Sequence, residues 1–193
     1  AETADLVVQA DAEPEEVASQ IMHRLQLTDV SLPEIGTDAW HVSTSTGNYQ
    51  VKVGHRFLAK ELVEYCRQEA DSSGISKVVL VSKPLVNQLH VIEIAACLEE
   101  AGFKAGIALM GDGEAHKTLQ TASSLYHQFV QLGVDRDSLA VAVGGGVTGD
   151  VAGFVAATYM RGIRWVQAPT TLLAQVDSSI GGKVAVDHPA GKN

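Results

Sequence analysis

The sequence predicts an α/β domain in which a mostly parallel sheet is covered by helices on both faces. From residue 49 onward, short apolar runs alternate with segments of helical periodicity, and this alternation is typical of βαβ units. The run at residues 77–81, KVVLV, is apolar after its lysine, as expected for a strand buried on both faces. Ligands of such sheets bind beyond the carboxyl ends of the strands. The loops of interest therefore follow residues 81, 110, 143 and 167.

The first part of the chain, residues 1–45, is predicted to be an acidic extension with one amphipathic helix. Val17, Ile21 and Leu25 recur at helical spacing within residues 11–26, after a proline and acids that suit a first turn. No chemistry is visible in this extension, so residues 46–193 are expected to form the functional α/β domain.

The elements of this domain follow from periodicity and from glycines at helix ends. Residues 49–53 alternate like an edge strand, and the helices expected at 85–101 and 114–132 each end before a glycine. The other expected elements are a helix at 57–71, strands at 77–81, 104–110, 139–143 and 164–167, and a helix at 148–160.

Charge and composition exclude several classes of function. A formal net charge of −9 argues against a surface for nucleic acids or anionic membranes, and no apolar run is long enough to span a bilayer. Local lysines, arginines and backbone amides must therefore hold any anionic ligand. Cys66 and Cys97 are too few for a disulfide framework and are expected to be small buried thiols in a reducing compartment.

The chain begins Ala-Glu-Thr-Ala. This start fits either the loss of an initiator methionine or the removal of a targeting peptide. The protein is accordingly expected in the cytoplasm, or in the plastid stroma if the start is a processing boundary.

A glycine-rich loop follows the strand expected at 139–143. Gly144, Gly146 and Gly149 match G-x-G-x-x-G between a strand and a helix, a pattern typical of Rossmann-like dinucleotide sites. Glycines let the backbone approach a pyrophosphate, whose charge is stabilised by the free amides and dipole of the helix. The motif alone is weak, because a tight turn packed on the sheet needs the same glycines.

Two features differ from the ordinary dinucleotide-binding layout. That layout places an acidic residue at the end of the next strand, but residues 167–170 read QAPT. The glycine loop also follows the fourth expected strand rather than the first. Asp150, in the first helical turn, either caps the helix or contacts a ribose or nicotinamide group, since it would repel a pyrophosphate.

A second loop, DGEAHK at residues 112–117, follows the strand expected at 104–110. One interpretation is a simple turn and helix start, where acids are favoured. The alternative places Asp112, Glu114 and Lys117 beside the glycine loop, where they would bind ribose hydroxyls.

The end of the chain contains polar groups suited to a phosphorylated, hydroxyl-rich substrate. Lys183 and Lys192 each follow a glycine, which allows close approach and lets the two ammonium groups converge on an anion. Asp177 and Asn193 would bind hydroxyl groups beside them. A solvated surface is the alternative for the lysines alone.

Other polar groups near the end of the chain are weaker candidates. Residues 170–171, Thr-Thr, can supply hydroxyls and amides at a helix start, and His188 is a low-ranked acid or base. The sequence contains no HExxH or CxxC motif and no convincing complete metal site.

Five segments together resemble 3-dehydroquinate synthase, a family of sugar-phosphate cyclases. They are DGEAHK at 112–117, GGGVTGD at 144–150, GFVAATYMRG at 153–162, PTTLLAQVDSSIGGK at 169–183 and HPAGKN at 188–193. The similarity is dense from residue 112 onward, weaker from 49 to 110 and absent before about residue 45. Matches to several loops in order are far more specific than the glycine motif alone.

The resemblance implies an NAD- and metal-dependent lyase of the shikimate pathway, which supplies aromatic amino acids. Such enzymes use zinc or cobalt and convert 3-deoxy-D-arabino-heptulosonate 7-phosphate to 3-dehydroquinate and phosphate. The implied NAD contacts are Asp112, Gly113, Glu114, Ala115, His116, Lys117, Gly146, Val147, Thr148, Gly149, Asp150, Thr170, Thr171, Lys183 and Lys192. The implied substrate contacts are Arg161, Asp177, Lys183 and Asn193, of which Lys183, Asp177 and Asn193 are also the implied catalytic residues. Arg161 could reach a phosphate across a homodimer.

The chain departs from the family pattern in two ways. Lys83 and Leu85 stand where the family usually has an aspartate and an asparagine for the adenosine ribose. The chain also ends at Asn193, before the family's helical C-terminal domain with its metal-binding glutamate and histidines. We therefore expect this chain to bind NAD without turning over substrate alone, with a C-terminal half supplied elsewhere. The alternatives are a valiolone- or inosose-forming cyclase and a non-catalytic nucleotide-binding scaffold.

Overall fold

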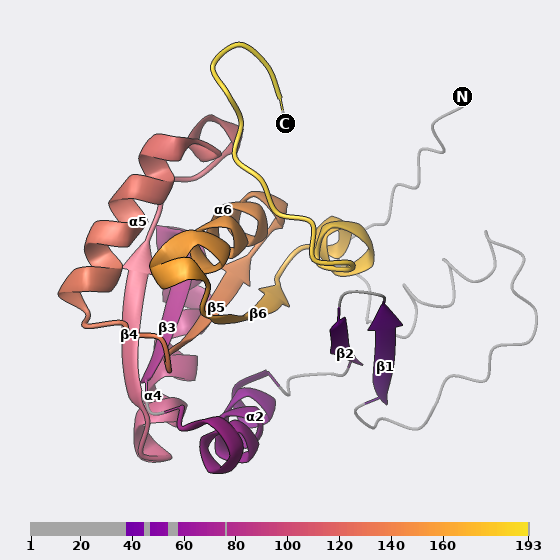
Figure 1. The fold of residues 1–193 in the computed structure, drawn as a ribbon, viewed down its shortest axis with the longest axis vertical. Coiled ribbons are helices and arrows are strands. Elements are labelled where there is room, and N and C mark those ends of the chain that lie inside the picture. Colours follow the sequence, from indigo (N-terminus) through magenta and orange to yellow (C-terminus); the bar gives the residue numbers. More distant parts are fainter. Residues whose placement is uncertain (1–37, 45–46, 54–57, 76, 193) are drawn as a thin grey trace, which may run out of the picture.

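The computed structural model describes residues 38–44, 47–53, 58–75 and 77–192. Its centre is a four-stranded parallel sheet in the order β4-β3-β5-β6 (Figure 1). The strands are β3 (Lys77–Ser82), β4 (Lys104–Leu109), β5 (Leu139–Gly144) and β6 (Arg164–Pro169). This sheet, with helices on both faces, confirms the α/β, Rossmann-like fold class predicted from the sequence.

Helices cover the sheet as two layers, each with its own core. Because successive side chains of a strand point to opposite faces, Val79 and Val81 of β3 join one core while Val78 and Leu80 join the other. The first core packs against α5 (Leu119–Gln131) and α6 (Gly146–Thr158), and the second against α2 (Leu58–Ser73) and α4 (Ile92–Glu100). The continuous apolar run of β3 is explained by this burial on both sides.

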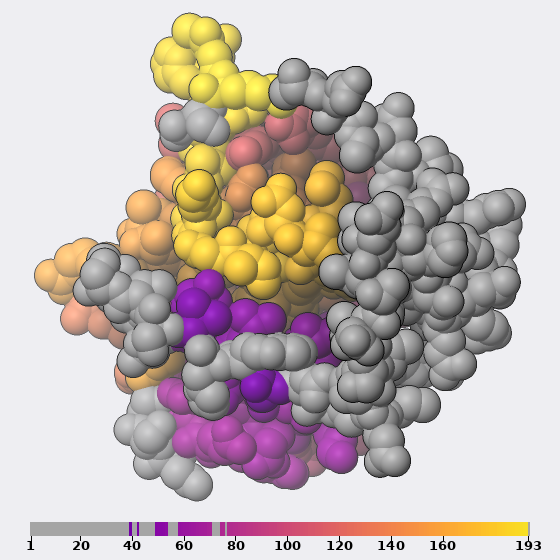
Figure 2. Space-filling view, turned by 90° about the vertical axis from the view of Figure 1, so that its right-hand side faces the viewer, coloured from indigo at the N-terminus to yellow at the C-terminus, as the bar shows by residue number. Residues whose placement is uncertain are grey.

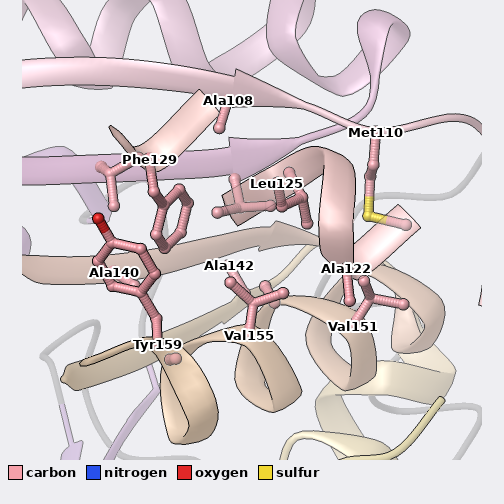
Figure 3. Close-up of a cluster of buried hydrophobic side chains, with 14 of the residues drawn as sticks. Ala108, Met110, Ala122, Leu125, Phe129, Ala140, Ala142, Val151, Val155 and Tyr159 are labelled. Carbon is pink, nitrogen blue, oxygen red and sulfur yellow. The ribbon is translucent and has the colours of Figure 1, made fainter. Parts of the chain in front are cut away.

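The first core is centred on aromatic rings between α5, α6 and the sheet. Phe129 is fully buried, and its ring meets the ring of Tyr159 edge to face with centroids 5.3 Å apart. Figure 3 shows both rings among small side chains such as Ala140 and Val155. Tyr159 also donates a hydrogen bond from its hydroxyl to the carbonyl oxygen of Val134 at 3.0 Å, which satisfies its buried polar end.

Three helices begin or end differently from the sequence prediction. The helix expected at 85–101 starts with α3 (Pro84–Val86), whose proline suits the first turn, and continues through a π-helical stretch, η1 (Asn87–Val91), into α4. The helix expected at 114–132 is a short 3₁₀ turn, η2 (Glu114–His116), followed by α5. The hydroxyl of Thr118 accepts a hydrogen bond from the amide of Thr121 at 3.2 Å, and this N-cap starts the regular helix.

The helix expected at 148–160 starts earlier and ends earlier than predicted. It is α6, which begins directly in the glycine loop and is followed by a 3₁₀ turn, η3 (Tyr159–Arg161). A glycine-rich helix start lacks the side-chain signals on which boundary prediction depends.

An antiparallel hairpin precedes the main sheet. The strand expected at 49–53 is β2 (Gly47–Val53), but it pairs with an unexpected strand, β1 (Asp38–Thr44), and not with the parallel sheet. The glycine loop therefore follows the third strand of the parallel sheet, not the fourth strand of one continuous sheet. The hairpin spans the expected domain boundary at residue 45, which stays a prediction, and the helix expected at 11–26 lies outside the described residues.

The order of strands reverses between β3 and β5. The chain runs from β3 outward to β4, then returns past β3 to β5 and continues to β6. At this reversal the hydroxyl of Ser82 donates a buried hydrogen bond of 2.7 Å to the carbonyl oxygen of Val143. In open α/β sheets, ligands bind in the crevice outside such a reversal, so the loops after β3 and β5 flank the expected site.

Candidate functional site

Loops from all four parallel strands meet at the carboxyl edge of the sheet. The amide of Thr170, after β6, donates to the carbonyl oxygen of Gly144 at the end of β5 at 2.9 Å. Three ion pairs connect the other loops. They join Lys83 to Asp112 at 2.6 Å, Lys117 to Asp150 at 2.8 Å and Lys192 to Glu114 at 3.0 Å. The structure thus brings the loop at 112–117 beside the glycine loop and the end of the chain.

The start of α6 offers backbone amides without a capping side chain. Gly145 is the N-cap residue, and no side chain forms a hydrogen bond at this cap. The first amides of a helix have no partner within the helix, and together with the helix dipole they favour an anion. An ideal Cβ on Gly146 would lie 3.0 Å from the Ser178 hydroxyl oxygen. Any larger residue would therefore occupy the narrow space between the start of α6 and Ser178. The arrangement fits the pyrophosphate of a dinucleotide.

Other glycines of the loop serve packing. A Cβ on Gly149 would lie 2.5 Å from Oε1 of Gln167, and one on Gly144 would lie 2.5 Å from the hydroxyl oxygen of Thr148. Thr148 itself is buried, and its contact with NAD stays a prediction. Close packing thus accounts for Gly144, while cofactor contacts of Gly146 and Gly149 stay predictions.

Asp150 is neutralised by Lys117. Both side chains are largely buried, at 13% exposure for Lys117 and 21% for Asp150. The hydrogen bond to Asp150 is the main cause that raises the pKa of Lys117. A lysine partner removes the repulsion that a carboxylate would otherwise exert on a pyrophosphate at the start of α6. The sequence offered no signal for this pairing, because Lys117 lies in the loop after β4 and Asp150 in the first turn of α6.

We expect replacement of Lys117 by methionine to lower the free energy of unfolding by about 1 kcal/mol at neutral pH, because it leaves a largely buried carboxylate without its partner. Since the folded-state pKa of Lys117 is raised, the pair stabilises fully below its ordinary pKa of 10.5 and the stabilisation is lost as pH rises through the higher folded value. Urea denaturation at pH 7 and about pH 11 tests this. Lys60→Met, on the exposed face of α2, is the control, and equal effects of both variants at pH 7 would contradict the expectation.

Lys83 extends from the end of β3 to Asp112 in the loop after β4. Its hydrogen bond is the main cause that lowers the pKa of Asp112. The neighbouring Leu85 is exposed. A Cβ on Gly111 would meet the exposed imidazole of His116, so a side chain at this position would require that ring to move.

The segment after β6 carries several predicted residues on an open surface. The Thr171 hydroxyl accepts a hydrogen bond from the amide of Ala174 at 3.3 Å, at the first residue of the π-helical turn η4 (Ala174–Ser178). Asp177 and Lys183 are exposed, and the segment forms part of the surface seen in Figure 2, in golden colours. Gly181 and Gly182, before Lys183, both have positive φ, which only glycine adopts easily.

His188 has a local structural role. Its Nδ1 accepts a hydrogen bond from the amide of Ala190 at 3.1 Å, within a turn closed between His188 and Gly191. This turn leads to Lys192, which is 78% exposed and paired with Glu114.

Arg161 is not brought to the glycine loop within one chain. It lies at the opposite end of α6, a helix of 13 residues, which corresponds to about 20 Å along the axis. Met160 and Arg161 both have positive φ, a conformation that costs energy for residues with side chains. A contribution of Arg161 from a second copy of the chain stays a prediction.

Asn193 lies outside the described residues. Among residues that the structure describes, no group of three or more histidine, cysteine, aspartate or glutamate side chains could hold a metal ion. The same part of the chain contains no helix with the length and apolar character needed to cross a membrane. Cys66 and Cys97 are both unpaired; Cys66 is fully buried, and burial raises the pKa of its thiol to about 11.

The comparison with known families decides what this site resembles. The family model described as 3-dehydroquinate synthase N-terminal matches residues 107–193. Residues 107–193 of the chain are thus similar to the N-terminal part of 3-dehydroquinate synthases. The segment contains the second loop, the glycine loop and the lysine-containing end.

Two curated 3-dehydroquinate synthases give the extent of the similarity. The protein of Pelotomaculum thermopropionicum is 63% identical over 117 residues, which are 61% of this chain and 32% of that protein. The protein of Thermodesulfovibrio yellowstonii is 40% identical over 160 residues, which are 83% of this chain and 41% of that protein. The chain thus spans well under half the length of these 3-dehydroquinate synthases.

Solved structures of related cyclases share the fold. A 2-deoxy-scyllo-inosose synthase complexed with carbaglucose-6-phosphate, NAD⁺ and Co²⁺ is 29% identical with a TM-score of 0.72, over 81% of this chain and 42% of that one. The 2-epi-5-epi-valiolone synthase ValA from Streptomyces hygroscopicus, with NAD⁺ and Zn²⁺ bound, is 29% identical with a TM-score of 0.57, over 64% and 34% of the two chains. Both of these solved structures are of cyclases, and they share the Rossmann-like fold of this chain.

Proposed function

We propose that this chain supplies the NAD-binding part of a 3-dehydroquinate synthase. The reaction converts 3-deoxy-D-arabino-heptulosonate 7-phosphate to 3-dehydroquinate with loss of phosphate. One observation carries the proposal. The start of α6, which has no capping side chain, lies at the point where the strand order reverses, and three ion pairs connect the loops around it. This arrangement lies largely within the segment that matches the family.

The glycine loop would hold the pyrophosphate of NAD. The amides of Gly146 and Val147 lie at the uncapped start of α6, while Gly149 and the neutralised Asp150 keep the helix close to the sheet and the local charge balanced. Since three lysines near the site are each paired with an acid, these amides would provide most of the stabilisation of the pyrophosphate.

The loop at 112–117 and the threonines after β6 would complete the NAD site. Asp112 and Glu114 offer carboxylates for ribose hydroxyls, and Gly113, Ala115 and His116 offer backbone and ring groups on the same open loop. Thr170 and Thr171 lie beside the glycine loop, since Thr170 is bonded to Gly144. When bound, NAD would accept and return a hydride at a ring hydroxyl of the substrate.

The end of the chain would bind the substrate. Lys183 and Lys192 present ammonium groups on glycine-rich backbone, suited to phosphate or carboxylate oxygens. Asp177 and Asn193 would orient ring hydroxyls, with Asp177 or Lys183 as proton carriers. The metal of the family does not fit the described residues, which lack a set of ligands, so we assign no step to it.

Phosphate release by the complete synthase, in which this chain is joined by a C-terminal half, tests this function. With NAD and a divalent metal, we expect release from 3-deoxy-D-arabino-heptulosonate 7-phosphate and formation of 3-dehydroquinate. Release from other sugar phosphates alone would favour the related cyclases, although the curated relatives at 40% and 63% identity support the first reaction. A folded protein that binds NAD but releases phosphate from no sugar phosphate would instead indicate a nucleotide-binding scaffold.

A further inference from the structure

The segment that carries Lys183 is weakly held on its amino-terminal side. Within residues 171–183, the only buried side chain is that of Ala174. Gly181 and Gly182, directly before the lysine, have positive φ, and a Cβ on either would meet no atom within 4 Å. Such glycines leave the backbone free to turn, so the contacts that follow Lys183 determine where its side chain lies.

A notch in α6 receives the residue that follows Lys183. An ideal Cβ on Gly153 would lie 2.4 Å from Cγ1 of Val184 and 2.7 Å from the ring of Trp165. Val184 therefore packs directly on the backbone of α6, and any side chain at position 153 would require Val184 and the ring to move. Glycine inside a helix is less favourable than alanine, and this close approach accounts for its presence here.

The chain beyond the notch is anchored in the domain. Val186 is buried in the first core, and the amide of Asp187 donates to the carbonyl oxygen of Lys117 at 2.8 Å. Figure 1 shows this last part of the chain, in yellow, passing α6. Residues 184–187, the anchor segment, directly follow Lys183 and so fix its backbone on the carboxyl-terminal side.

The helix α6 connects the two parts of the proposed site. Gly146 at its start and Gly153 are seven residues apart, so they lie on the same face of the helix, about 10 Å apart along its axis. The helix start presents the amides proposed for the pyrophosphate, while the notch seats the residue after Lys183. One rigid helix therefore sets the separation between the proposed cofactor and substrate groups.

We propose that Gly153 is a positioning residue, whose notch seats Val184 and thereby holds Lys183 toward a phosphorylated substrate. The inference rests on the proposed function, since it needs Lys183 in the substrate site. A side chain at position 153 would push the anchor segment away from α6. Because the glycines before Lys183 offer no resistance, the lysine would move with the anchor segment while the glycine loop stays in place.

Steady-state kinetics of the complete synthase with 3-deoxy-D-arabino-heptulosonate 7-phosphate test the proposal, together with fluorescence titration by NADH. Gly153→Ala should raise the KM for this substrate at least about tenfold and change the affinity for NADH by less than about twofold. Val184→Ala removes the opposite side of the contact without a clash and should raise the KM about threefold.

A double-mutant cycle shows whether Gly153 acts through Lys183. In the Lys183→Ala background, Gly153→Ala should change the KM by less than about twofold, because the group that it misplaces is already absent. Relief of the clash should also restore function. Val184→Ala and Trp165→Phe, added to Gly153→Ala, should return the KM to within about threefold of the unmodified value.

Gly106→Ala in β4 is the matched control. A Cβ at this position would lie 3.2 Å from the side chain of Leu132, so the variant strains packing between β4 and the end of α5. It should lower stability without changing the KM. Urea denaturation of every variant measures stability separately from the kinetics.

The possible failures are distinguishable. An unchanged KM in folded Gly153→Ala overturns the inference, as does a rise in KM that persists in the Lys183→Ala background. If Gly153→Ala does not fold, Val184→Ala decides, since a raised KM supports the inference and an unchanged KM overturns it. In these cases the unmodified enzyme still turns over its substrate and the proposed function stands. No turnover by the unmodified complete synthase overturns the proposed function together with the inference.

Discussion

Replacing Phe129 by alanine should lower the free energy of unfolding by about 3–5 kcal/mol, the usual range for a fully buried phenylalanine. The ring is fully buried between α5 and the sheet and packs against Tyr159 (Figure 3). Its loss would leave a cavity that the regular strands and helices around it cannot close. Equilibrium denaturation in urea measures the effect.

The neighbouring residue provides a matched control. Val130 follows Phe129 on the same helix but is 66% exposed, so Val130→Ala should change stability by no more than about 0.5 kcal/mol. A loss below about 1 kcal/mol for Phe129→Ala would contradict the packing described for this core.

Replacing Gly146 by valine should weaken NAD binding at least about 30-fold, equivalent to about 2 kcal/mol. A Cβ at this position already lies 3.0 Å from the Ser178 hydroxyl, and the two methyl groups would cover the first amides of α6. Stability should change by less than about 1 kcal/mol, since the residue lies at the helix start and not in the core. Fluorescence titration with NADH and urea denaturation measure the two effects.

Gly191→Ala is the control for this substitution. A Cβ on Gly191 meets no atom within 4 Å, and this glycine does not have positive φ, so neither affinity nor stability should change. Unchanged NADH affinity in a folded Gly146→Val protein would remove the start of α6 from the binding site.

The strands of the parallel sheet were predictable because their burial leaves a direct trace in the sequence. β3 and β5 are buried on both faces, and each appears as an uninterrupted apolar run. The carboxyl-edge location of the loops at 112–117 and 144–150 followed from the parallel arrangement alone. These two inferences were sufficient to assemble most of the candidate site.

Features that depend on pairing across the fold were not predictable. Nothing local to Asp150 indicates Lys117 as its partner, and nothing local to Lys83 indicates Asp112. β1 was missed although Trp40 and Val42 alternate with His41 and Ser43, which is the pattern of a strand. Ser82 was also overlooked, although a serine at the end of an apolar strand is a signal that it needs a buried partner.

The role of individual glycines likewise required three-dimensional contacts. The motif G-x-G-x-x-G treats Gly146 and Gly149 alike, yet a Cβ on Gly149 would meet the amide of Gln167 on β6, whereas Gly146 lies at the uncapped start of α6. The sequence pattern alone does not show this difference.

We propose that the carboxyl edge of this sheet binds NAD, and calorimetric titration of the folded protein with NAD is the sharpest test. We predict saturable binding of one NAD per chain, with an affinity that falls at least about 30-fold in Gly146→Val. Absence of saturable binding up to about 1 mM NAD by the folded protein would contradict the account.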